Sequence, residues 1–259
     1  MAYAPFNLAG KVALVTGGNR GIGWGMSEAL AQSGADVAIW GRDQAKNEEA
    51  AKKLAAHGVR AKGYKVDVAD ENQVNAAMEA TLKDFGRVDF AVANAGIGAG
   101  SKFSEFPTEV YRRVLSVNLD GVFFTLRAVC KHMVARAEAG DPGGSLVGVA
   151  SLAAIEGAAR NEAYAATKGA VISMMKSIAV EHARYGVRAN AVLPGWIATD
   201  MTAGAQAAPA FAEKVIPRVP ARRWGEPKDF GGVAVYLASD ASSYHSGDLF
   251  VIDGGYAIF

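Results

Sequence analysis

The sequence predicts an α/β fold in which a doubly wound sheet of about seven parallel strands carries helices on both faces. The first observation behind this prediction is the regular alternation of short apolar runs with longer amphipathic stretches, joined by short connections. Such alternation implies right-handed crossovers and therefore a parallel sheet that is covered on both sides. The second observation is the composition, since 51% of the 259 residues are hydrophobic and can bury a core. No linker, composition shift or internal repeat marks a boundary, so we expect a single domain over residues 1–259.

The elements follow in chain order from periodicity, residue type and turn residues. Residues 11–16 (KVALVT) form a short β-branched run that ends at glycines, and residues 21–33 continue as a helix. The other strands are short apolar runs of the same kind, expected at residues 36–40, 60–66, 88–93, 145–150, 187–193 and 249–252. The other helices have Ala, Glu and Lys or apolar residues at helical spacing, expected at residues 44–57, 71–85, 108–137, 162–185 and 228–239. Residues 195–220 are expected to be a loop-rich segment.

Charge and composition argue against several classes of function. The chain has 27 Lys and Arg against 26 Asp and Glu, which disfavours binding to nucleic acid or to a membrane through bulk positive charge. One Cys cannot form an internal disulfide, and the four His have no zinc-ligand spacing. There is no signal-peptide pattern and no apolar run of about 18 residues. We therefore expect a soluble, cytoplasmic protein with no metal, nucleic-acid or membrane partner.

Glycines are concentrated where the first strand ends. The chain has 30 Gly, whereas an average content of about 7% would give about 18. Residues 16–23 (TGGNRGIG) connect the first strand to the first helix. Glycines in such a turn let the backbone approach a pyrophosphate, while the helix N-terminus supplies free N–H groups. The spacing differs from the general G-x-G-x-x-G fingerprint, so this loop alone leaves an ordinary tight turn as an alternative.

Two further loops follow strands at the same edge of the predicted sheet. Asp67 and Val68 follow the third strand, and Asn94, Ala95 and Gly96 follow the fourth. Each of these pieces alone is a common cap or turn. Ligands of open parallel sheets bind at the carboxyl ends of the strands, so the three loops together line one rim of the sheet.

A second set of polar residues could carry proton transfer. Tyr164 and Lys168 are four residues apart at the start of a predicted helix, which places them side by side on one face. A free Tyr titrates at a pH of about 10, and a neighbouring ammonium lowers the pKa of the phenol. Tyr164 is then a candidate general acid or base. Ser151, after the fifth strand, can donate a hydrogen bond to a carbonyl oxygen that gains charge.

In chain order these motifs resemble the classical short-chain dehydrogenase/reductase family, whose fold is of the Rossmann type. The resemblance covers residues 8 to about 255 and includes the glycine loop, the Asn-Ala-Gly turn, and Ser151 followed thirteen residues later by Tyr164. Asn118, the Pro-Gly pair at 194–195 and the closing Asp-Gly-Gly at 253–255 also fall where the family has them. The sequence is similar to 3-oxoacyl carrier-protein reductases and to sugar or polyol dehydrogenases of this family.

The resemblance implies an oxidoreductase that transfers a hydride between a nicotinamide and a ketone or secondary alcohol. By this resemblance, Tyr164 would transfer the proton, Ser151 would hold the substrate oxygen, and Lys168 would lower the pKa of Tyr164 and bind the nicotinamide ribose. Asn118 would hold a water that joins Lys168 to solvent. The residues implied to bind the cofactor are Gly17, Asn19, Arg20, Gly21, Ile22, Gly23, Arg42, Asp67 and Val68 (at the adenine), Asn94, Ala95, Gly96, Tyr164, Lys168, Pro194, Gly195, Ile197, Thr199 (at the carboxamide) and Met201.

The end of the second strand indicates NADP(H) as the cofactor and leaves NAD(H) as the less favoured alternative. A site for NAD usually has an acidic residue about 20 residues after the glycine loop, which binds the ribose 2′-OH. Gly41 occupies that place here, and Arg42 follows it. Together with Arg20 of the glycine loop, Arg42 suits a 2′-phosphate. Asp43 is interpreted as a helix N-cap because it comes one or two residues too late.

The small carbonyl or alcohol substrate is expected to contact loops 97–102, 152–161 and 196–217, and the last of these is expected to form a lid. The sequence does not select among sugars, acyl thioesters, cyclic ketones and steroids. The resemblance also implies a homotetramer, in which the helices beginning at Thr108 and Glu162 pack across subunits. The alternative class is a non-catalytic nucleotide-binding or scaffolding protein on the same fold, against which the intact Ser, Tyr and Lys argue.

Overall fold

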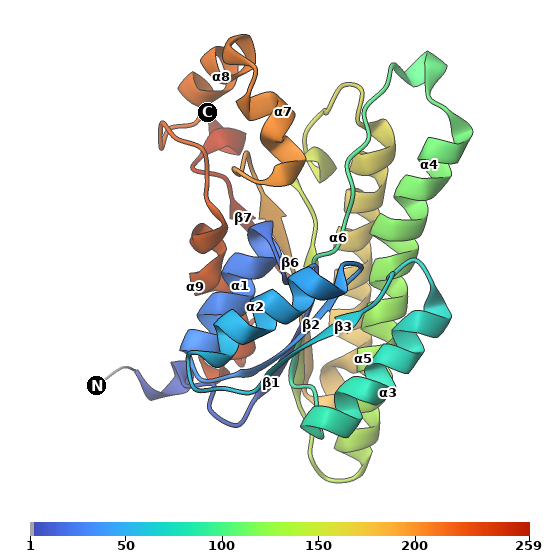
Figure 1. Ribbon diagram of the computed structural model, residues 1–259, viewed down its shortest axis with the longest axis vertical. Coiled ribbons are helices and arrows are strands. Elements are labelled where there is room, and N and C mark those ends of the chain that lie inside the picture. Colours follow the sequence, from blue (N-terminus) through green and yellow to red (C-terminus); the bar gives the residue numbers. More distant parts are fainter. Residues whose placement is uncertain (1–2) are drawn as a thin grey trace.

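The computed structural model describes residues 3–259, so the first two residues of the predicted domain lie outside it. One seven-stranded parallel sheet runs through the molecule in the order β3-β2-β1-β4-β5-β6-β7 (Figure 1). The doubly wound parallel sheet predicted from the sequence is thus confirmed, and its order reverses between β1 and β4, where such sheets bind ligands. The strands are β1 (Val12–Thr16), β2 (Asp36–Gly41), β3 (Ala61–Lys65), β4 (Phe90–Ala93), β5 (Gly144–Val149), β6 (Val187–Pro194) and β7 (Leu249–Ile252).

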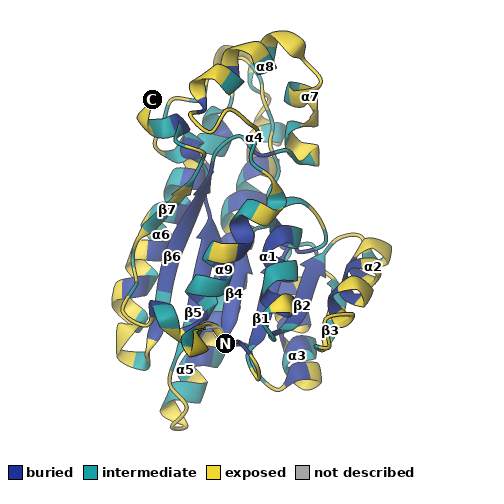
Figure 2. Cartoon of the chain, turned by 90° about the vertical axis from the view of Figure 1, so that its left-hand side faces the viewer, coloured by how far each residue is buried: buried dark blue, intermediate teal, exposed yellow. Residues whose placement is uncertain are grey.

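Helices cover both faces of the sheet and its carboxyl end. One face carries α1 (Gly21–Gln32), α2 (Gln44–Ala55) and α9 (Gly231–Ala238), and the other carries α3 (Glu71–Phe85), α5 (Gly121–Glu138) and α6 (Glu162–His182) (Figure 1). The carboxyl end carries α4 (Thr108–Leu115), α7 (Ala203–Gln206) and α8 (Pro209–Val215) (Figure 2). Within residues 3–259, no helix is both long enough and apolar enough to span a bilayer.

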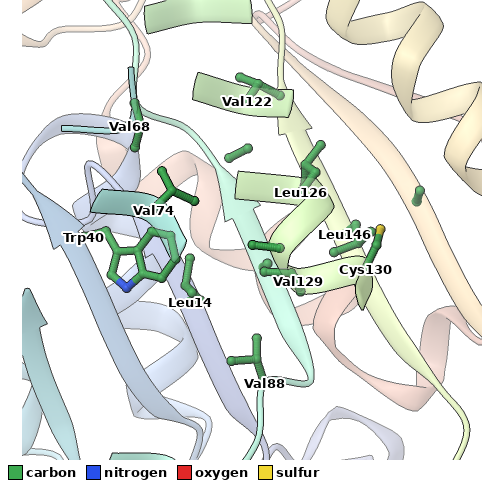
Figure 3. Close-up of a cluster of buried hydrophobic side chains, with 14 of the residues drawn as sticks. Leu14, Trp40, Val68, Val74, Val88, Val122, Leu126, Val129, Cys130 and Leu146 are labelled. Atoms are coloured by element: carbon green, nitrogen blue, oxygen red, sulfur yellow. The ribbon is translucent and has the colours of Figure 1, made fainter. Parts of the chain in front are cut away.

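The central strands are buried on both faces because their apolar residues alternate between two cores. Leu14 of β1 and Trp40 of β2 pack towards α3 and α5, where they meet a cluster that includes Leu126 (Figure 3). Val15 of β1 points to the opposite face and packs with Met26 of α1. Strands that are buried on both sides read as continuous apolar runs, which explains why they could be predicted from the sequence.

Two expectations about the elements are wrong. Residues 108–137 do not form one helix, because one turn of π-helix, Ser116–Asp120, separates α4 from α5. Its extra residue lets the buried Asn118 amide turn inwards and bond both backbone groups of Ile97. Residues 195–220 are not only loop, since they contain the short helices α7 and α8.

Candidate active site

The glycine loop leaves the first turn of α1 open to an anion. Gly17 and Gly21 have φ angles of +65° and +53°, in the left-handed region that side chains rarely adopt. A Cβ on Gly23 would collide with the Gly17 carbonyl and the Asn94 amide. The N-terminus of α1 has no side-chain cap and no acidic residue in its first turn, so its N–H groups are available to a phosphate. These residues therefore fit the pyrophosphate of a dinucleotide.

Thr16, which the sequence did not single out, joins the glycine loop to the next loop of the site. Its buried Oγ1 accepts hydrogen bonds from the backbone N–H groups of Asn94 and Ala95, both at 2.9 Å. The Asn94 side chain returns a hydrogen bond of 2.9 Å to the Thr16 carbonyl. The two loops at the point where the strand order reverses thus form one rigid unit.

The cations expected beside the adenosine ribose have different surroundings. Arg20 Nη1 lies 3.1 Å from Asp200 Oδ2, so its guanidinium reaches the segment after β6. Arg42 is exposed at the end of β2. Asp43 caps α2 by accepting a 3.2 Å hydrogen bond from the Lys46 N–H, which confirms its interpretation as an N-cap. Asn19 of the glycine loop donates a 2.6 Å hydrogen bond to Asn47 of α2, another residue that the sequence did not single out.

The loop after β3 is held by its own polar contacts. Asp67 Oδ1 accepts a 3.1 Å hydrogen bond from the Ala69 N–H, and its Oδ2 lies 3.5 Å from Arg113 of α4. The Val68 side chain is buried and packs closely on Gly121, since a Cβ on Gly121 would lie 2.7 Å from Val68 Cγ2. Both residues stand at the predicted rim, and the Asp67 backbone is fixed beside it.

Lys168 lies buried beneath Tyr164 at the end of β5. Its Nζ donates a 2.7 Å hydrogen bond to the Val149 carbonyl and lies 5.5 Å from the centre of the Tyr164 ring. Lys168 is only 3% exposed. Burial disfavours its charged form and lowers the pKa of Lys168 to about 8. The spacing of four residues thus brings the two side chains together, as the sequence predicted.

The pKa of Tyr164 is shifted in the direction opposite to the one we expected from Lys168. Burial raises the pKa of Tyr164, because a phenolate loses more hydration than a phenol, and this effect exceeds the lowering by a hydrogen bond with Ser151. The Ser151 Oγ also accepts a 3.2 Å hydrogen bond from the Ala153 N–H, which fixes its position. Burial therefore favours the protonated phenol of Tyr164 at neutral pH, with Ser151 as its polar neighbour.

Asn118 and Gly96 complete the surroundings of the Lys168 amine. A Cβ placed on Gly96 would lie 3.3 Å from Asn118 Oδ1 and 3.6 Å from Lys168 Nζ, so the three residues meet in one small volume. The Asn118 amide donates to the Ile97 carbonyl at 2.9 Å and accepts from the Ile97 N–H at 2.8 Å. With both ends of its side chain engaged, Asn118 fixes the turn after β4 against Lys168.

The segment after β6 lies over the glycine loop. A Cβ on Gly21 would lie 3.4 Å from Thr199 Cγ2, and a Cβ on Gly98 would lie 3.7 Å from Met201 Cγ. The segment thus spans from the loop after β1 to the loop after β4. Packing places the other predicted residues of this segment. Pro194 ends β6, Gly195 lies against Asp253, and Ile197 is buried and forms a β-bridge with Gly225. Ile22 of the glycine loop packs on the core that lies between α1 and the sheet.

Metal chemistry has no visible site in the part of the chain that the structure describes. No three His, Cys, Asp or Glu side chains of residues 3–259 are grouped so that they could hold an ion. Cys130 is a free, buried thiol whose pKa is raised to about 12 by burial, as expected for a packed side chain.

Known proteins are similar to this chain both in sequence and in fold. A family model described as enoyl-(acyl carrier protein) reductase matches residues 17–257. The 5-keto-D-gluconate 5-reductase of Escherichia coli (strain K12) is 36% identical over 250 residues, which cover 96% of each chain. The chain belongs to the short-chain dehydrogenase/reductase family. It is an NAD(P)-dependent oxidoreductase that transfers a hydride between the nicotinamide and a ketone or secondary alcohol, as the sequence predicted.

Two further members of the family show the range of cofactors. The L-rhamnose 1-dehydrogenase (NAD(P)(+)) of Sphingomonas sp. (strain SKA58) is 37% identical over 249 residues, which cover 96% of each chain. A crystal structure of a gluconate 5-dehydrogenase from Burkholderia cenocepacia J2315, in complex with NADP and tartrate, has a TM-score of 0.93 and 35% identity. The match covers 98% of this chain and 99% of that one. The NADP in that complex agrees with the cofactor predicted from Gly41 and Arg42.

Proposed function

We propose that this dehydrogenase interconverts a keto group and a secondary alcohol on a sugar acid or a related polyhydroxy compound, with NADP(H) as the cofactor. The observation that carries the proposal is the contact of Ser151, Tyr164 and Lys168 at the end of β5, beside a glycine loop that fits a pyrophosphate. The relatives named above, which act on 5-keto-D-gluconate, gluconate and L-rhamnose, support the substrate class.

The chain supplies orientation and a proton. A bound nicotinamide would supply or accept the hydride. Ser151 donates a hydrogen bond to the keto oxygen, and Tyr164 donates its phenolic proton to the same oxygen as charge develops there. The raised pKa of Tyr164 keeps this proton in place at neutral pH, which suits reduction. Lys168 stabilises the phenolate that remains, and its pKa of about 8 allows it to exchange a proton near neutral pH.

The cofactor contacts follow from the rim residues. The N–H groups at the start of α1 bind the pyrophosphate, and the loop fixed by Thr16 closes beside it. The absence of an acidic side chain at Gly41 and the exposed Arg42 support NADP(H) over NAD(H). We assign Thr199, whose Cγ2 would lie 3.4 Å from a Cβ on Gly21, to the carboxamide. The remaining predicted contacts, among them Asp67 and Val68 at the adenine, complete this proposal.

Arg160 supports an acidic substrate. It lies in the loop between Ser151 and Tyr164, is exposed, and has a φ of +66°, which is rare for a residue with a side chain. The strained backbone is held from both sides, since its N–H donates to Glu162 at 3.0 Å and its carbonyl accepts from Ser101 at 3.0 Å. We assign its guanidinium to the carboxylate of the substrate.

Residues 196–217 form a substrate lid within a single domain in this proposal. The support is an aromatic contact that joins the start of the segment to α8, since the Trp196 and Phe211 rings lie 4.9 Å apart. An apolar groove between α4 and the start of α6, lined by Phe103, Phe106 and Tyr111, supports a homotetramer that packs through these helices. A cytoplasmic location fits the single, unpaired Cys130.

The test is the oxidation of NADPH and of NADH in the presence of a panel of carbonyl compounds. The panel contains 5-keto-D-gluconate, a neutral ketose and a 3-oxoacyl thioester. We expect turnover with the keto acid and NADPH, less with the neutral sugar, and less with NADH. Turnover only with the thioester would refute the substrate class, and a clear preference for NADH would refute the cofactor. Cofactor binding without turnover on any compound would favour the non-catalytic alternative.

A further inference from the structure

We propose that Asn47 is a specificity-determining residue, because its buried amide keeps the end of β2 free of a side chain at position 41. That position is where an NAD-preferring site would have the carboxylate that binds the ribose 2′-OH. The inference rests on the proposed NADP(H) preference and deepens it, since it names the residue that enforces the preference.

Asn47 connects three segments around the end of β2. It lies in α2 and is fully buried. Its Nδ2 donates hydrogen bonds of 2.8 Å to the Gly41 carbonyl and 2.9 Å to the Tyr64 carbonyl. Its Oδ1 accepts the 2.6 Å hydrogen bond from Asn19 of the glycine loop. Both amide hydrogens and the amide oxygen are therefore engaged, one each with β2, β3 and the loop.

The amide of Asn47 fills the space that a side chain on Gly41 would need. A Cβ on Gly41 would lie 2.5 Å from Asn47 Oδ1, closer than real Cβ atoms come to a neighbour, and 3.0 Å from Asn19 Nδ2, which is a tight contact. The φ of Gly41 is not positive, so its backbone lies outside the left-handed region that favours glycine. Position 41 thus needs glycine for space and not for its backbone conformation.

Asn47 cannot move aside without cost. On its other side, a Cβ on Gly63 would lie 2.6 Å from Asn47 Cβ and 2.8 Å from Asn47 O, so helix and strand are already in close contact. Rotating the amide would take this donor from the partly buried carbonyls of Gly41 and Tyr64, although the Gly41 carbonyl would keep its 3.0 Å hydrogen bond from the Val66 N–H.

Charge disfavours the acidic residue in addition. The nearest neighbour of a side chain at position 41 would be Asn47 Oδ1, which is an acceptor and has no hydrogen to offer a carboxylate. Meanwhile the exposed Arg42 beside it remains available to a 2′-phosphate. The Asn47 amide thus excludes a carboxylate at position 41, which would select NAD(H), and leaves Arg42 free to select NADP(H).

The experiment is a set of four variants, G41A, G41D, N47A and G41D/N47A, with equilibrium binding of NADPH and of NADH by calorimetry and the Tm of each protein without cofactor. We expect G41A and G41D to lower the Tm and to weaken NADPH binding without creating tight NADH binding. In G41D/N47A, we expect the ratio of NADH to NADPH affinity to exceed that of G41D by at least about tenfold. We also expect G41D to lower the Tm less in the N47A background than in wild type.

Two results would overturn the inference. One is a G41D protein that binds NADH as tightly as G41D/N47A does. The other is an equal Tm loss from G41D with and without Asn47. If G41D fails to fold, G41A, which adds only the Cβ, gives the Tm comparison through a G41A/N47A protein, and an equal Tm loss from G41A with and without Asn47 would overturn the inference. A wild-type protein that binds NADH better than NADPH would instead contradict the proposed cofactor, and the Tm coupling of positions 41 and 47 would still be measured independently.

Discussion

Replacing Lys168 by methionine should stabilise the protein while it removes the activity. Lys168 is 3% exposed, and among the described residues its amine donates to one partner, the Val149 carbonyl at 2.7 Å. Burial lowers the pKa of Lys168 from 10.5 to about 8. At about 1.36 kcal/mol per pKa unit, the charged amine costs the folded protein about 3 kcal/mol. Methionine has a similar length and no charge, so it fills the space without this penalty.

The sign of the pH dependence follows from the two states of the protein. The unfolded chain keeps the Lys168 proton up to a pH near 10.5, and the folded chain keeps it only up to about 8. The wild-type free energy of unfolding should therefore rise with pH between these two values. The variant loses one hydrogen bond, worth about 1 kcal/mol, so its net gain near neutral pH is about 2 kcal/mol. Near pH 10.5 the gain should vanish or become a small loss.

The assay is urea unfolding of the wild type and K168M, without cofactor, at neutral pH and near pH 10. K176M is the matched control, because Lys176 lies on the same helix and is exposed. Its effect on stability should be small and should show no comparable change with pH. A K168M protein that is less stable than wild type at neutral pH would refute the reasoning. A stability difference that stays constant with pH would do the same.

Three further predictions follow from the same contacts. T16V removes an acceptor of two partly buried N–H groups, of which the Asn94 N–H keeps the Val92 carbonyl at 3.1 Å, so it should lower the free energy of unfolding by about 1–2 kcal/mol. T16S should keep the wild-type stability, and equal urea midpoints for all three proteins would contradict this. D200N removes the charge that Arg20 pairs with at the surface, so the free energy of unfolding should change by less than about 1 kcal/mol. The affinity for NADPH should rise while the affinity for NADH does not. Equal shifts of the two affinities, measured by calorimetry, would speak against this role of Arg20. Burial raises the pKa of Tyr164, and alcohol oxidation needs the phenolate whereas ketone reduction needs the phenol. Oxidation should therefore become faster as pH rises, and reduction should become slower above the pKa of Tyr164. If the pH profiles of kcat/KM had the same slope in both directions, Tyr164 would not be the acid and base.

The parts of the site that could be predicted from the sequence are those tied to the ends of strands. In a parallel sheet these ends meet at one edge, so the sequence alone could bring together the glycine loop, Ser151 and the Asn-Ala-Gly turn. Tyr164 and Lys168 could be paired because a helix sets the geometry of residues four apart. In both cases local backbone structure determines the arrangement.

The parts that could not be predicted depend on contacts between distant segments. Asn47 looks like an ordinary helix residue in the sequence, and its role arises only from β2, β3 and the glycine loop around it. The partner of Arg20 is 180 residues away. The direction of the Tyr164 pKa shift depends on how completely the phenol is desolvated. The extent of this desolvation could not be predicted from the spacing of Tyr164 and Lys168 in the sequence. The π-helical turn at Asn118 likewise follows from a contact with Ile97.

The most direct measurement of the central claim compares wild type with Y164F, which removes one hydroxyl from the proposed proton donor. NADPH binding is measured by calorimetry, and single-turnover reduction is measured with the best substrate of the panel. We predict that Y164F binds NADPH as the wild type does and reduces the ketone more slowly by about 100-fold or more, because the keto oxygen then has no phenolic proton to receive. Reduction at the wild-type rate by a protein that lacks the Tyr164 hydroxyl would contradict the account.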